Sequence, residues 1–141
     1  MGIALGYVAI FLGGLIAAVT APLDLEKGSW LAAYLILVAG LAQLLLSHQA
    51  QILHASIPSV RDSWTELSLF VAGNAAVIIG SLLALPLLVD FGGIALIGAL
   101  VLALRAAAGA QNTWRAWAFR VFYAAVIISV PIGLVLAHLR A

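Results

Sequence analysis

The chain contains no cysteine, and its 141 residues include only six Lys or Arg and five Asp or Glu. Without cysteine, the chain cannot form disulfides, thiolate metal sites or a thiol nucleophile. The formal net charge of +1 provides no basic tract, so no nucleic-acid partner is expected. The chain also lacks the H-E-x-x-H, G-x-S-x-G, P-loop and G-x-G-x-x-G motifs. We therefore do not predict an enzyme.

Apolar residues dominate what is present. The sequence is 66% hydrophobic and 8% charged, and its mean hydropathy is +1.25. Soluble domains are about half apolar and about a quarter charged, so this composition predicts an integral membrane protein in contact with the lipid bilayer. A chain of this length cannot hold a membrane bundle and a further soluble domain of about 50 residues or more, so residues 1–141 are expected to form one domain. The first apolar run has no basic n-region and is too long for a signal peptide, so we interpret it as a retained span.

Charges, glycines, prolines and capping residues divide the chain into five expected spans, giving an all-α bundle of five transmembrane helices. The spans cover residues 3–20, 29–53, 64–88, 93–110 and 114–139. The third is expected to begin at the S-x-x-E capping box of residues 63–66 and to contain Pro86. Asp90 is expected to cap the fourth span, and Asn112 or Thr113 the fifth.

The fourth segment leaves a second topology open, because Arg105 follows only the uninterrupted residues 94–104. That stretch could be a re-entrant helix, which would leave four spans. His138 would then reach the same membrane face as His48 and His54. We prefer five spans, because the segment has no internal proline and an arginine near a helix end can extend to the interface.

The basic residues favour one orientation of the five-span protein. Four arginines share one side, whereas only Lys27 and Arg140 lie on the other. The positive-inside rule then predicts a multi-pass protein of a prokaryotic plasma membrane with a cytoplasmic N-terminus and an external C-terminus. Three tryptophans, at positions 64, 114 and 117, are expected at the cytoplasmic interface. The four arginines are Arg61, Arg105, Arg115 and Arg120.

One face of the second span is unusually polar for a membrane helix. Four side chains fall within an arc of roughly 80°, and His48 lies beside them. They are Gln43, Ser47, Gln51 and His54. Such groups can simply join helices, but histidine can also ligate haem iron or bond a quinone. His48 and His54 are about 240° apart, so one straight helix cannot aim both at one metal.

The last half of the second span is expected to meet the arginine-bearing ends of the fourth and fifth spans. The candidate ligand-binding residues are therefore His48, Gln51, His54, Gln43, Ser47, Arg105 and Arg120. His48 or His54 is the candidate haem ligand, and no other metal site is predicted.

Small residues are expected to mark the faces on which helices pack in lipid. The third span carries them at a strict interval of four residues, and the first span shows the same register. These two ladders are Ala72, Ala76, Gly80 and Ala84, and Gly2, Gly6, Gly14 and Ala18.

Three functions remain open from the sequence. The leading interpretation is a small, non-catalytic accessory or scaffolding subunit of a larger membrane complex, such as a respiratory complex. Its partners would be other membrane subunits or further copies of the chain. The alternative is a binding protein for a hydrophobic redox ligand, haem or quinone, on the polar face of the second span. A permeation pathway lined by that face is weaker, because no charged ring or ionisable group is expected near the membrane midplane.

Overall fold

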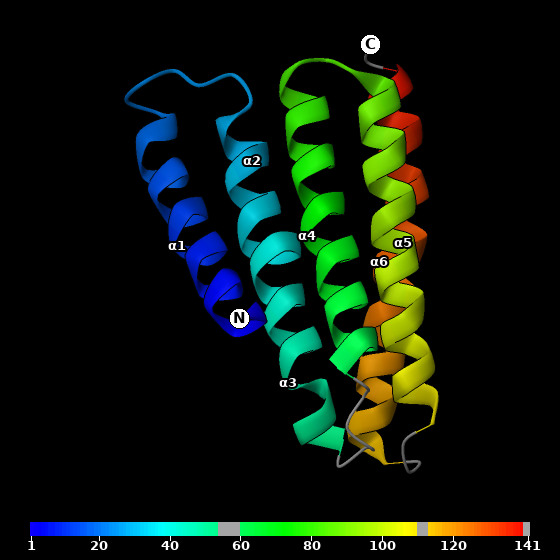
Figure 1. Ribbon diagram of the computed structural model, residues 1–141. Coiled ribbons are helices and arrows are strands. Elements are labelled where there is room, and N and C mark those ends of the chain that lie inside the picture. Colours follow the sequence, from blue (N-terminus) through cyan, green and yellow to red (C-terminus); the bar gives the residue numbers. More distant parts are fainter. Residues whose placement is uncertain (54–59, 110–112, 140–141) are drawn as a thin grey trace. The chain divides into compact units, whose positions relative to one another are not determined.

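The computed structural model describes residues 1–53, 60–109 and 113–139, and every regular element in that part of the chain is a helix. The elements are α1 (Gly2–Thr20), α2 (Gly28–Tyr34), η1 (Leu35–Ala42), α3 (Gln43–Leu53), α4 (Val60–Leu82), α5 (Pro86–Ala108) and α6 (Trp114–Leu139) (Figure 1). Because α2, η1 and α3 follow one another without a break, the described residues contain five helices long and apolar enough to cross a membrane. The predicted five-helix, all-α membrane fold is confirmed. Since α5 continues through Arg105, no re-entrant segment is needed.

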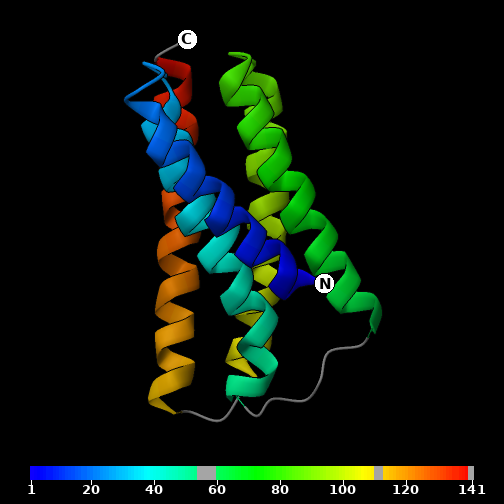
Figure 2. The same cartoon turned by 90° about the vertical axis from the view of Figure 1, so that its left-hand side faces the viewer.

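The chain divides into two compact units, residues 1–48 and 49–141. In the first unit, α1 and the following α2 and η1 form an antiparallel hairpin closed by the turn at residues 21–27 (Figure 1). In the second unit, α4 and α5 form another hairpin, and α6 packs along α5 (Figures 1 and 2). The end of α3, from Gln49 onward, belongs to this second unit.

Glycines allow the two helices of the first hairpin to approach closely. A Cβ atom added to Gly6 would lie 2.8 Å from Leu44 Cγ, and one added to Gly13 would lie 2.7 Å from Ile36 Cγ1. Both glycines are buried. A larger side chain at either position would force Leu44 or Ile36 to move, or α1 to shift away from the second helix of the hairpin.

Glycines also lie at the contact between the two helices of the second hairpin. Gly73 and Gly80 of α4 are also seven residues apart, and a Cβ atom on either would come within 3.0 Å of the α5 backbone. From the other side, a Cβ atom on Gly92 of α5 would lie 2.7 Å from the carbonyl oxygen of Gly73 and from the amide nitrogen of Val77. Two turns of helix return a side chain to within about 20° of its starting direction, so glycines at this spacing share one face.

The predicted four-residue ladders are therefore only partly correct. Gly6 and Gly80 make the expected close contacts, but Ala72, Ala84 and Gly14 are exposed. Each four-residue step advances about 40° around an α-helix, so a ladder of four members drifts off the contact face.

The boundary between the third and fourth spans lies earlier than predicted. α4 ends at Leu82 rather than near residue 88, and Pro86 is the first residue of α5 rather than lying inside the third span. Proline is favoured at a first helical position because it has no N–H to leave unpaired and its φ is already helical. It also forces the preceding residue, Leu85, out of the helical region (φ −106°, ψ 88°). Asp90 consequently lies within α5 and does not cap it.

Ala84 closes this turn in a left-handed conformation, with φ 53°. The N–H of Leu85 then donates to the Gly80 carbonyl at 2.8 Å, which is the long hydrogen bond of a Schellman C-cap. Glycine usually occupies the left-handed position, because other residues meet a steric cost there.

The starts of α4 and α6 gave one wrong and one correct prediction. α4 already begins at Val60, so the predicted capping box at residues 63–66 lies inside the helix. Between the two box residues, Thr65 Oγ1 donates to the carbonyl of Arg61 one turn back in the same helix, at 2.9 Å. α6 begins at Trp114, and the N–H of Ala116 donates to Thr113 Oγ1 at 3.4 Å, which confirms Thr113 as its N-cap.

The middle of the second span is a π-helix, η1, rather than the α-helix that was assumed over residues 29–53. A π-helix bonds residue i to i+5, so each residue advances less far around the axis than in an α-helix. The polar face of α3 is therefore turned, relative to α2, away from the direction that a single α-helix would give. Gly40, within η1, is buried and lies beside Gly6 of α1.

Candidate functional site

The predicted polar face begins with Gln43 and Ser47, which contact each other in the first unit. Gln43 Nε2 donates to Ser47 Oγ at 3.3 Å, one helical turn away. Gln43 is only 4% exposed, and its Oε1 has no hydrogen-bond partner among the described residues. The Gln51 side chain and the whole of His54 lie outside the described part of the chain, as does the side chain of His138.

His48 has an oriented imidazole. Its Nδ1 lies 2.9 Å from the Leu44 carbonyl oxygen, and the residue is half-buried. A carbonyl oxygen only accepts, so Nδ1 carries the proton of this bond and the lone pair of the neutral ring is on Nε2. Metal-ligating histidines are commonly oriented in this way, by a hydrogen bond from the nitrogen that does not bind the metal.

The second unit contains a buried hydrogen-bonded cluster of Gln49, Tyr123 and the Ala103 carbonyl. Gln49 Nε2 donates to Ala103 O at 2.9 Å, and the Tyr123 hydroxyl donates to Gln49 Oε1 at 2.6 Å. Gln49 is 6% exposed, and Tyr123 is fully buried. Through these two bonds, the end of α3 is joined to both α5 and α6. Within the second unit, the end of α3 from Gln49 onward is therefore bonded to residues of the fourth and fifth spans.

That contact does not come from the predicted polar face. Gln49 lies about 240° around the helix from Gln43, on the opposite side from the predicted residues. Tyr123 was not singled out at all. The sequence does contain an indication of its role, because a phenol hydroxyl within an apolar span needs a hydrogen-bond partner when it is buried.

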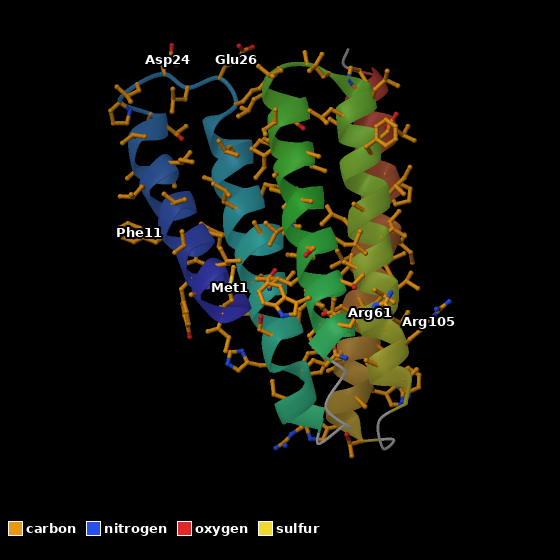
Figure 3. All side chains as sticks on the ribbon, viewed as in Figure 1. Met1, Phe11, Asp24, Glu26, Arg61 and Arg105 are labelled. Atoms are coloured by element: carbon orange, nitrogen blue, oxygen red, sulfur yellow. The ribbon has the colours of Figure 1, made fainter. Side chains whose placement is uncertain are left out.

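The two arginines named as candidates have different environments. Arg120 of α6 donates from Nε and Nη2 to the Ala107 carbonyl, at 3.4 and 3.3 Å, and from Nη2 to the Ala108 carbonyl at 3.3 Å. These carbonyls end α5, where intrahelical donors run out and the helix dipole favours a cation. Arg105 is exposed and points away from the helices (Figure 3). Arg120 therefore caps a helix, whereas Arg105 lies on the surface.

Other polar groups in the second unit bond within their own helix. Asn74, which is 6% exposed, donates from Nδ2 to the Phe70 carbonyl at 2.8 Å, and its Oδ1 has no partner among the described residues. In that part of the chain, no three His, Cys, Asp or Glu side chains gather into a group that could hold a metal ion.

No protein-family model, curated protein or solved structure matches this chain. The site is therefore interpreted from its own geometry. That geometry provides a buried amide and phenol that join three helices, an arginine that caps α5, and one oriented imidazole at His48.

Proposed function

We propose that this multi-pass membrane protein is a non-catalytic accessory or scaffolding subunit of a larger membrane complex, such as a respiratory complex. The outer side of α1 carries this proposal. Gly14 and Ala18 are exposed there, and a Cβ atom on Gly14 would meet nothing within 4 Å. Of the residues of α1, only Gly6 and Gly13 are buried. Small side chains let helices approach closely in lipid, so this side of α1 suits a partner's transmembrane helix.

The buried polar groups support the non-catalytic part of the proposal. Gln49 and Tyr123 bond each other, and Arg120 bonds the end of α5. These hydrogen bonds join one helix to another. A helical unit held together by such bonds is what a scaffolding subunit would present to its neighbours.

The proposal is tested by recovering the protein from its native membranes in a gentle detergent. We expect at least one other membrane subunit to co-purify in a fixed ratio. Gly14→Leu should lose that partner, whereas the matched change Ala125→Leu, at an exposed position of α6, should keep it. Recovery of the unmodified protein as a clean monomer or homo-oligomer would contradict the proposal.

The orientation proposed from the arginine count is a cytoplasmic N-terminus and an external C-terminus. Because the chain has no cysteine, single cysteine variants can be labelled without background. Arg115→Cys should react with a membrane-impermeant maleimide only from the cytoplasmic side, and His138→Cys only from outside. The reverse pattern would show that the orientation is inverted. Labelling of both residues from one side would exclude the five-span topology.

A second candidate function is the binding of haem or quinone, and the oriented ring of His48 favours it. With Nδ1 bonded to Leu44, Nε2 is the nitrogen that could ligate haem iron or bond a quinone carbonyl. The sequence names further candidate ligand-binding residues, namely His54, Gln43, Ser47, Gln51, Arg105 and Arg120.

An optical spectrum and an organic extract test this second function. Purified protein should show a Soret band if it holds haem, or should release quinone on extraction. His48→Ala should lose the ligand, and Gln49→Leu, at the next position and about 100° around the helix from His48, should retain it. Protein that carries neither ligand would exclude this function.

A further inference from the structure

One end of the second unit combines arginines with exposed tryptophans. Because α4, α5 and α6 alternate in direction, the first turns of α4 and α6 lie at the same end as the last turn of α5 (Figures 1 and 2). We call this the arginine end. It comprises Arg61, Trp64, Arg105, Trp114, Arg115, Trp117 and Arg120.

The tryptophans of the arginine end do not belong to a protein core. Trp64, Trp114 and Trp117 are 52%, 77% and 58% exposed. Indole rings prefer the headgroup level of a bilayer, where the ring meets hydrocarbon and the N–H meets polar groups. These three side chains therefore indicate that the arginine end lies at the depth of lipid headgroups.

The arginines supply positive charge at that depth. Arg61, Arg105 and Arg115 are exposed, and the Arg115 guanidinium carbon lies 6.0 Å from the centre of the Trp114 ring. With Arg120 there are four cations, against the two acids Asp62 and Glu66, so the end has a net charge of +2. At the other end of this unit, the described residues include Asp90 but no lysine or arginine.

We propose that the arginine end binds the phosphate groups of anionic phospholipids. A guanidinium can donate two parallel hydrogen bonds to one phosphate and keeps its charge at any physiological pH. An anionic membrane surface attracts each nearby arginine with a gain of roughly five-fold in binding. The three exposed arginines together then favour an anionic over a zwitterionic lipid by at least about ten-fold. Arg120 contributes less, because it already bonds the end of α5.

Native mass spectrometry of the full chain in a neutral detergent tests the proposal. The protein is titrated with phosphatidylglycerol or with phosphatidylcholine of the same acyl chains, and the bound lipids are counted. We expect tighter binding of phosphatidylglycerol by at least about ten-fold, weakened by added salt. The triple variant R61Q/R105Q/R115Q should lose the preference, and Lys27→Gln, a charge removal in the first unit, should keep it.

Several outcomes would overturn the proposal. One is equal binding of the two lipids by the unmodified protein, and another is a preference that survives in the triple variant. Complete displacement of the lipid by millimolar glycerol phosphate would show that the site takes a soluble phosphate instead. If the triple variant does not fold, as judged by circular dichroism and gel filtration, the single variants R105Q and R115Q must each reduce the preference.

Discussion

Replacing Tyr123 by phenylalanine would remove one hydroxyl from the buried cluster and leave the aromatic ring in place. The lost bond is 2.6 Å long, and Gln49 Oε1 would remain buried without its donor. A buried group that loses its partner costs about 1–3 kcal/mol in soluble proteins, whereas hydrogen bonds in membrane bundles average about 0.6 kcal/mol and reach about 1.7 kcal/mol. Both groups here are nearly inaccessible, so we expect a free energy of unfolding lowered by about 1–1.5 kcal/mol.

A double-mutant cycle separates this bond from packing changes. Gln49→Leu removes the acceptor and leaves the Tyr123 hydroxyl unpaired, whereas the double variant replaces both partners with apolar groups. The double variant should therefore be less destabilised than the sum of the single variants, by about 1 kcal/mol. Unfolding in mixed micelles of a mild detergent and sodium dodecyl sulfate, followed by circular dichroism, measures each free energy.

The control is Tyr7→Phe in α1, because the Tyr7 side chain is 61% exposed. It should change the free energy of unfolding by no more than about 0.5 kcal/mol. If Tyr123→Phe behaves like this control and the double variant is additive, the bond does not hold the end of α3 in the membrane, and the reasoning fails.

Three further predictions concern helix contacts and ends, and each is measured by the same unfolding assay. Gly92→Ala should destabilise the α4–α5 hairpin by about 1–3 kcal/mol, because the added Cβ meets backbone atoms at 2.7 Å. The control Gly98→Ala meets only a leucine methyl at 3.8 Å and should be neutral or stabilising. Equal effects of the two changes would refute the close contact at Gly92. Ala84→Gly should stabilise the protein by about 0.5–1 kcal/mol by relieving the left-handed conformation, and a loss of stability would contradict that geometry. Arg120→Met should lower the free energy of unfolding by about 1 kcal/mol, because α5 loses its cap. Arg105→Met in neutral detergent should change it by less than about 0.5 kcal/mol. A larger effect of Arg105→Met than of Arg120→Met would contradict these two roles.

The number of spans could be predicted because bilayer thickness sets the length of apolar sequence that each span needs. A run of about 20 apolar residues has few alternatives to crossing, and all five runs are helices. The exact boundary near Pro86 could not be taken from hydropathy, since residues 82–89 are uniformly apolar on both sides of the turn. Proline at a first helical position was the better signal, and it also divides the region into two helices of 23 residues.

The polar face of the second span shows a different limit. Helical periodicity correctly placed Gln43 beside Ser47, yet Gln49, on the other side, makes the bonds to α5 and α6. In water, the hydrophobic effect turns an apolar face inward, so periodicity also predicts which face is buried. Lipid is as apolar as leucine, and this directional force is absent. Periodicity then gives the neighbours along one helix but does not give the face that meets another helix.

Arg105 and Arg120 show what does determine such contacts. Both are single arginines in apolar segments, and their local sequences do not distinguish them. Their difference follows from chain connectivity: α5 ends at Ala108, α6 begins at Trp114, and Arg120 is the seventh residue of α6. The short connection reverses the chain direction, so this position comes level with the last carbonyls of α5, where the regular α-helical donors run out. An arginine two turns into a helix that follows a short reversal can therefore be predicted to cap the preceding helix. Arg105 precedes the end of its own helix by one turn, and its side chain is exposed.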